Sequence, residues 1–172
     1  MSARWLSEQT VGLIQKAVKD GIGPALTAVR VQRGDAAVST EPPPSQSYFN
    51  FEGAKGYRCP AIFTVIDSMD MMNTDRGPNF IAARARVIVS VVVEDRTLPL
   101  LTLKAWRYQA ALHSVLHLTT LTSADNKVRL ESRIERVLFG PEYSDATSKD
   151  VPQGVFRKEV ALHLDVEHFE AL

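Results

Sequence analysis

The sequence predicts an α+β fold: a mostly antiparallel β-sheet with a long protruding β-hairpin and two helices packed on one face. Two stretches, 7–19 and 97–117, carry apolar residues at helical spacing. Two others, 80–94 and 155–167, alternate apolar and polar residues, as strands do. The resulting order of helix, strand, hairpin, helix, strand and strand favours helices packed on an antiparallel sheet.

The first helix is expected to begin near Ser7, an N-cap residue type. Its buried face consists of three apolar residues at helical spacing: Val11, Ile14 and Val18. Gly21 and Gly23-Pro24 are expected to stop or kink this helix, because proline removes a helical hydrogen bond. The alternating residues 29–32 are then expected to form a short strand.

The segment 61–94 predicts a long hairpin with its loop at 67–79. One face of its second strand is formed by small apolar residues: Ala83, Ala85, Val87, Val89, Val91 and Val93. A strand over 80–94 would extend about 50 Å, whereas a domain of this length has a radius of gyration of about 16 Å. We therefore expect part of the hairpin to leave the body of the domain.

The remaining segments complete one domain over 1–172. Residues 34–56, with three prolines at 42–44, predict a long loop, and its 41–47 stretch is expected to be exposed. The second helix should begin after Thr97 and bury a stripe of five residues: Leu101, Ala105, Tyr108, Leu112 and Val115. Residues 119–126 predict a polar turn, 128–139 a strand and 140–154 a loop.

Composition excludes several classes of protein. Twenty Lys and Arg residues balance 20 Asp and Glu residues, which counts against a dedicated nucleic-acid binder. The single cysteine, Cys59, allows no internal disulfide and is interpreted as a structural thiol. No apolar run approaches the ~20 residues that span a bilayer. We therefore expect a soluble protein, made inside a cell, with no membrane partner.

No residue pattern predicts a catalytic, cofactor-binding or metal site. His113 and His117 are four apart on the second helix, but no third ligand follows at a fitting spacing. The acidic residues of loop 67–79 miss the calcium-loop pattern. We expect no enzyme and no cofactor. A small intracellular enzyme that uses Asp67, Asp70 or His113 is kept as an alternative.

A subunit or partner interface is the site that the sequence does predict. Three methionines in the hairpin loop, Met69, Met71 and Met72, would be exposed on a polar tip, and methionine is common at binding surfaces. Arg84 and Arg86 share one face of the following strand and join this candidate interface. The alternative is that the loop folds back and the methionines cover the protein's own core.

Four segments carry a resemblance to a known family. They are the proline-led strand 57–65 (YRCPAIFTV), the valine-rich strand 84–96, the helical segment 103–112 (LKAWRYQAAL) and the closing strand 156–166 (FRKEVALHLDV). In order and length they resemble the tail terminator proteins of long-tailed bacteriophages. The resemblance covers about 57–170 and, more weakly, the opening helix.

The resemblance implies a structural virion protein without catalytic residues. Its copies would form a six-membered ring that caps the tail tube, ends tube growth and joins the tube to the head connector. The implied partners are further copies of the chain, the tail tube protein and the head–tail connector proteins, and genomic DNA would pass through the ring without sequence-specific binding. The implied location is the tail or neck of a virion assembled in the host cytoplasm. Another neck or tail component, such as a head-completion or stopper protein or a tail-tube subunit, is the alternative.

Overall fold

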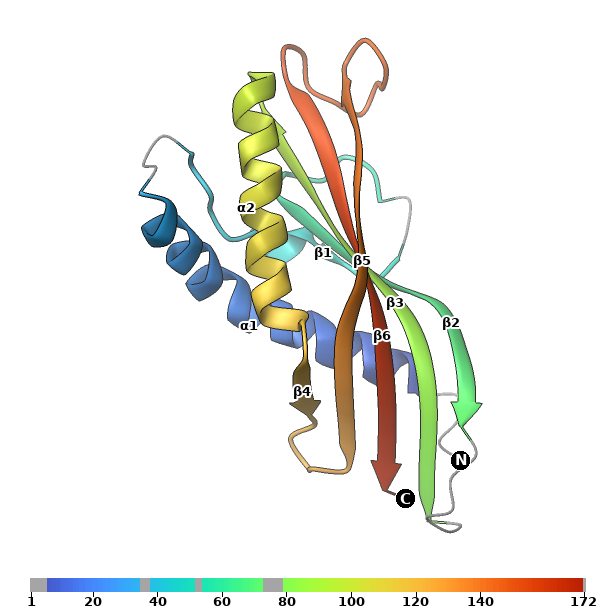
Figure 1. The fold of residues 1–172 in the computed structure, drawn as a ribbon. Coiled ribbons are helices and arrows are strands. Elements are labelled where there is room, and N and C mark those ends of the chain that lie inside the picture. Colours follow the sequence, from blue (N-terminus) through green and yellow to red (C-terminus); the bar gives the residue numbers. More distant parts are fainter. Residues whose placement is uncertain (1–5, 35–37, 52–53, 73–78, 172) are drawn as a thin grey trace.

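The computed structural model describes residues 6–34, 38–51, 54–72 and 79–171. In these residues, two long helices lie against one six-stranded sheet (Figure 1). The elements in chain order are α1 (Leu6–Arg33), the short 3-10 helix η2 (Ser45–Ser47), β1 (Tyr48–Phe49), β2 (Ala61–Met72), β3 (Phe80–Asp95), α2 (Leu98–Leu116), β4 (Thr119–Thr122), β5 (Val128–Ser144) and β6 (Phe156–Ala171). No helix among the described residues is long and apolar enough to cross a membrane.

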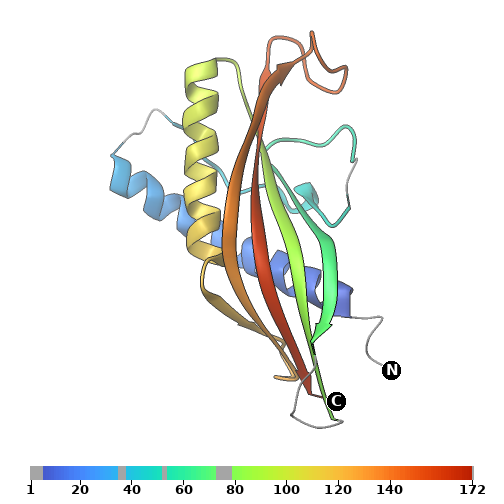
Figure 2. The same cartoon turned by 45° about the vertical axis from the view of Figure 1, so that its right-hand side comes forward.

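The sheet has the strand order β1-β2-β3-β6-β5-β4. Only the β1–β2 pair is parallel, and every other neighbouring pair is antiparallel. Figure 2 shows both helices associated with a strongly curved sheet. These features confirm the predicted α+β fold class.

The predicted hairpin is the β2–β3 pair, but its loop is shorter than expected. Strand β2 continues to Met72, so the segment 67–72 belongs to the strand and not to the loop. A register shift between Ile66 and Ser68 leaves Asp67 without a paired residue on β3, so the alternation of the strand is broken at this position. Residues 73–78 of the expected loop lie outside the described residues.

Strand β3 does not leave the domain as part of an isolated hairpin. It pairs with β6 along its whole length, from Phe80 opposite Ala171 to Asp95 opposite Phe156. The lower ends of β2, β3, β6 and β5 together extend beyond the helices in Figure 1. The long alternation of apolar and polar residues in 80–94 therefore reflects a long sheet. Strand β3 forms backbone hydrogen bonds with β2 on one side and with β6 on the other.

Helix α1 is twice as long as the predicted one, because Gly21, Gly23 and Pro24 do not end it. Ile22 and Leu26 are buried on its core face. Burying each contributes about 1.5–3 kcal/mol, which offsets a cost of about 3 kcal/mol for an interior proline. The prediction of a short strand at 29–32 is wrong for the same reason, since these residues continue the helix.

Gly21 marks the place where the two helices approach each other. A Cβ atom at this position would lie 3.0 Å from a γ-carbon of Val115 on α2. The missing side chain therefore allows close packing of α1 against α2. A residue interpreted from the sequence as a helix stop is instead part of the contact between the helices.

The core lies between the helices and one face of the sheet. Val87, Val89 and Val91 of β3 pack there with Leu101, Ala105, Tyr108 and Leu112 of α2, which confirms the predicted helix stripe apart from the half-buried Val115. From α1, four residues join the same cluster: Ile14, Val18, Ile22 and Leu26. The inward faces of β5 and β6 complete it.

The other segments differ from prediction mainly at their ends. The predicted loop 34–56 contains η2 and β1, and within its 41–47 stretch Pro43 and Ser47 are buried rather than exposed. The polar segment 119–122 is the strand β4, which an edge position allows because its outer side needs no apolar residues. Strand β5 extends to Ser144 across two register shifts, and β6 begins at Phe156 and extends to Ala171.

Candidate functional site: the open face of the sheet

The face of the sheet opposite the helices is the candidate interaction surface. On β3, Ile88, Ser90 and Val92 alternate with the buried valines and therefore point to this second face. We call this surface the open face. It has an apolar half near β1 and a charged half toward the C-terminal end of β6.

The apolar half contains a small aromatic cluster. Phe63 of β2 stacks on Phe49 with ring centroids 5.0 Å apart and meets Tyr57 edge-on at 5.2 Å. Ala61 and Val92 are buried with Phe63 in this cluster. Residues 54–60 thus cover one end of the open face.

A groove lies beside this cluster and has a volume of about 560 Å³. Its floor is formed by residues of four strands: Val65, Ile88, Ala161 and Leu138. Leu138 is 37% exposed, although leucine is usually buried. Glu159 also lines the groove and forms no ion pair within the described residues. The groove therefore has an apolar floor and several polar lining residues, of which Glu159 is the acidic one.

Arg157 holds the far end of the apolar half together. Its guanidinium donates hydrogen bonds to Glu94 Oε2 at 3.1 Å and to the backbone carbonyls of Asp150 and Tyr57 at 3.0 and 3.4 Å. It also lies 5.0 Å from the centroid of the Tyr57 ring, as in a cation–π contact. Because its side chain is buried, this arginine links β3, β6 and two loops and is not available to a partner.

The charged half contains the two arginines that the sequence analysis assigned to an interface. Arg84 donates two hydrogen bonds to Asp165 on β6, from Nε at 2.6 Å and from an η-nitrogen at 2.5 Å. These bonds, together with the charges of Arg133 and Arg86, lower the pKa of Asp165. Arg86 is exposed and forms no ion pair within the described part of the chain. Of the two arginines, Arg84 is thus engaged within the chain and Arg86 faces solvent.

The three methionines do not share one environment. Met69 lies on β2 and packs against the main core, and its sulfur lies 3.9 Å from the Ser7 hydroxyl of α1. Met71 and Met72 are exposed, Met71 by 59%. The sequence predicts one exposed tip for all three, which is correct only for Met71 and Met72. The alternation along β2 separates them, because Met69 and Met71 face the helix side whereas Met72 faces the open side.

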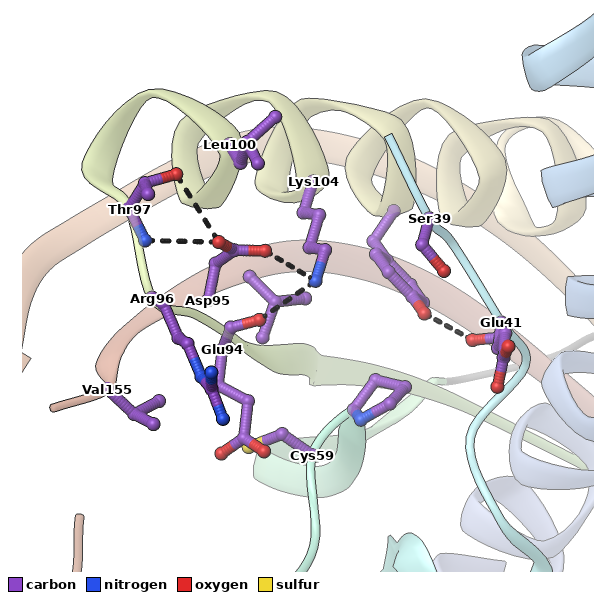
Figure 3. Close-up of a pocket in the computed structure, with 13 residues that line it drawn as sticks. Ser39, Glu41, Cys59, Glu94, Asp95, Arg96, Thr97, Leu100, Lys104 and Val155 are labelled. Carbon is purple, nitrogen blue, oxygen red and sulfur yellow. Dashed lines mark hydrogen bonds and ion pairs between the residues drawn. The ribbon is translucent and has the colours of Figure 1, made fainter. Parts of the chain in front are cut away.

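A second cavity lies on the helix side, between α2, the end of β3 and Cys59, with a volume of about 680 Å³ (Figure 3). Two of its charged side chains pair: Lys104 Nζ lies 2.7 Å from Asp95 Oδ2 and also donates a hydrogen bond to the backbone carbonyl of Glu94 at 3.2 Å. Burial would raise the pKa of Asp95, but hydrogen bonds from Lys104 and from the Thr97 amide lower it. Tyr108 donates a hydrogen bond to the Glu41 carbonyl. These contacts attach α2 to its surroundings.

Cys59 lines this cavity, and its environment does not suit a nucleophile. Burial raises the pKa of its thiol to about 12. The thiol is therefore protonated at neutral pH, whereas the thiolate is the reactive form. This agrees with the interpretation of Cys59 as a structural residue.

The residues of the alternative enzyme hypothesis lie on separate elements. Asp67 and Asp70 are exposed on β2, and His113 lies on α2. His113 stacks on His117, with ring centroids 4.5 Å apart, and His117 Nδ1 accepts a hydrogen bond from the Ile134 amide of β5. Among the described residues, no group of three His, Cys, Asp or Glu side chains could hold a metal ion.

The sequence does not predict the groove of the open face. Its residues come from four strands, and only the pairing of β2, β3, β6 and β5 brings them together. The one available signal was the presence of Ile88 and Val92 among the polar positions of the β3 pattern. Apolar residues on the nominally polar face of a strand indicate that this face is also partly covered or bound.

Comparison with known proteins gives structural likenesses only. No protein-family model and no curated protein matches the chain. Among solved structures, the chain is similar to a protein chain from a structure described as "Virion of native gene transfer agent (GTA) particle". The similarity has a TM-score of 0.39 and 15% sequence identity, and it covers 87% of this chain and 97% of that chain. An identity this low transfers no residue role to this chain.

Proposed function

We propose that this chain is a structural virion protein, the tail terminator of a long-tailed bacteriophage. In this role its copies form a ring, a hexamer by the family resemblance, that caps the tail tube and ends its growth. The ring also joins the tube to the head connector, and the genome passes through it. The protein resides in the tail or neck of a virion and is assembled in the host cytoplasm.

The observation that carries the proposal is the exposed groove in the apolar half of the open face. Val65, Ile88 and Leu138 form a groove on a surface that no described helix covers. Contiguous apolar surface of this kind is typical of proteins that bind other proteins. A zero formal charge on the whole chain is also compatible with close packing of identical copies. The order of strands and helix that resembles the tail terminator family makes the ring the preferred form of assembly.

Electron microscopy of tube growth tests the proposal. The purified chain is mixed with the tail tube protein of the same virus while tubes polymerise. We expect ring-shaped particles of the chain alone or at tube ends, and tubes that stop growing when the ring is present. Tubes built from this chain itself would instead indicate a tube subunit. Binding to the head connector without any effect on tube growth would indicate a stopper protein.

Antibody labelling of intact virions provides a second readout. The terminator role predicts label at the junction of head and tail. Label along the whole tail, or none on the virion, contradicts it. A terminator also gives no turnover with the general hydrolase substrates that would detect a small enzyme.

A further inference from the structure

The groove of the open face offers a binding site for an apolar element that carries positive charge. Its floor of Val65, Ile88 and Leu138 excludes water from a partner's aliphatic side chains. Glu159 is the acidic group among its lining residues and has no cationic partner in the described part of the chain. An arginine or lysine next to aliphatic residues therefore matches this groove.

The C-terminal end of α1 has this chemistry. Val31 is 74% exposed, the largest exposed fraction of any large apolar side chain in the described residues. Arg30 and Arg33 lie in the same last turn, on other sides of the helix than Val31, and form no ion pair within those residues. Figures 1 and 2 both show this end of α1 extending past α2 and away from the sheet. It is a projecting helix end that nothing described in the same chain covers.

The groove and the helix end lie on opposite sides of the sheet. Helix α1 packs on the face formed by Val87 and Val89, whereas Ile88 between them lines the groove. A single chain cannot bring these two surfaces together without unfolding. Two copies can, and a contact between two different surfaces is heterologous, the kind that closes into a ring.

We propose that the C-terminal end of α1 of one copy docks into the open-face groove of a second copy. Val31 contacts the groove floor, and Arg30 and Arg33 approach Glu159. In this mode the end of a helix enters an apolar groove, so that side chains from different sides of its last turn can contact the groove, and charge complementarity sets its orientation. The inference rests on the proposed function, because it specifies the contact between neighbouring subunits of the ring.

Cross-linking tests the geometry directly. A chain carrying both Val31→Cys and Leu138→Cys is treated with a short bifunctional maleimide. Native Cys59 serves as an internal background, since burial keeps its thiol protonated. A heterologous contact produces a ladder of covalent species beyond the dimer, and an isologous contact stops at the dimer. The controls are the two single variants, which we expect to give no species beyond the dimer.

Charge exchange tests the energetics. Glu159→Arg should weaken association of copies at least about tenfold, because it places like charges together. Adding Arg30→Glu and Arg33→Glu to that variant should restore association toward the wild-type level. Circular dichroism and denaturation confirm that each variant is folded.

The outcomes separate this inference from the proposed function. If the wild type forms rings but the double-cysteine variant gives no ladder, or charge exchange has no effect, the docking inference is wrong and the ring stands. If the wild type is monomeric at every concentration and does not cap tubes, the terminator function is wrong, and the inference falls with it. A ladder beyond the dimer together with restored association supports the docking contact.

Discussion

On β3, Val87, Val89 and Val91 are fully buried under two helices, whereas Ile88 between them lines an open groove and Arg84 and Arg86 reach solvent. The same strand therefore faces two environments with a period of two residues. The helix-covered face contains the main core and should determine the stability of the monomer. The open face has partial cover, paired charges and a groove, and should determine what the protein assembles with.

The largest expected effect is on the covered face. Leu112→Ala removes a fully buried side chain from the main core and should lower the free energy of unfolding by about 2–5 kcal/mol. Leu138→Ala on the open face is the matched control, because its side chain is already partly exposed. We expect it to cost less than about 1 kcal/mol. If urea unfolding gave the same loss of unfolding free energy for both variants, the two faces would not differ in their contribution to stability.

An intermediate effect is expected where the open face is locally buried. Arg157→Met keeps the aliphatic stem but leaves Glu94 and two backbone carbonyls without their donor. Loss of hydrogen bonds to this charged group should cost about 1.5–3 kcal/mol. Arg136→Met, an exposed arginine without an ion pair within the described residues, is the control and should change little. A neutral Arg157 variant would mean that the loops are held by other contacts.

The third effect is a pH dependence. His168 is buried, its Nδ1 lies 2.8 Å from the Thr10 hydroxyl of α1, and burial lowers its pKa below the ordinary value. The unfolded chain therefore binds a proton at higher pH than the folded chain, so stability is present above about pH 6.5 and falls as the pH drops below it. His113, whose pKa is also lowered by burial and by His117, adds to the same trend.

Urea unfolding between pH 7 and pH 5 measures this effect. His168→Gln should flatten the slope of stability against pH between these two values. Asp165 does not interfere, because the stability from its lowered pKa is lost only near and below the ordinary aspartate value of about 3.9. A wild type with constant stability over this range would contradict the burial of a neutral His168.

The smallest effect is expected at the charged half of the open face. Arg84 and Asp165 form a two-bond ion pair, but the arginine side chain is 53% exposed. Solvent screens such pairs, so a double-mutant cycle of Arg84→Met and Asp165→Asn should give a weak coupling, smaller than the effect of Arg157→Met. A coupling as large as the loss caused by Leu112→Ala would show that this half of the face is also part of the stabilising core.

The sequence allowed the covered face to be predicted well. The alternation through 80–94 and the stripe from Leu101 to Leu112 specify which side chains are buried, because local periodicity determines the orientation of side chains on strands and helices. Prediction from the sequence failed where tertiary packing outweighs the helix propensity of single residues. Pro24 and Gly21 are helix breakers by propensity, yet burial of Ile22 and Leu26 continues the helix through them.

The open-face site was less predictable. Arg84 could be placed on the outer face of its strand, but its partner Asp165 lies 81 positions away and is known only from the β3–β6 register. Met69 was placed with Met71 and Met72 because a loop was expected where β2 continues. The groove depends on four strands at once, and no local pattern specifies such a register.

Static light scattering of two aspartate variants tests most directly whether the open face, and not the helix-covered face, determines assembly. Leu138→Asp places a charge in the groove of the open face, and Leu98→Asp makes the same change at an exposed leucine near the N-terminus of α2, where an acidic residue is favourable. The account predicts that both remain folded, that Leu98→Asp keeps the molar mass of the wild-type assembly, and that Leu138→Asp falls to the 19.1 kDa monomer. A Leu138→Asp protein with the same assembled mass as the wild type would contradict it.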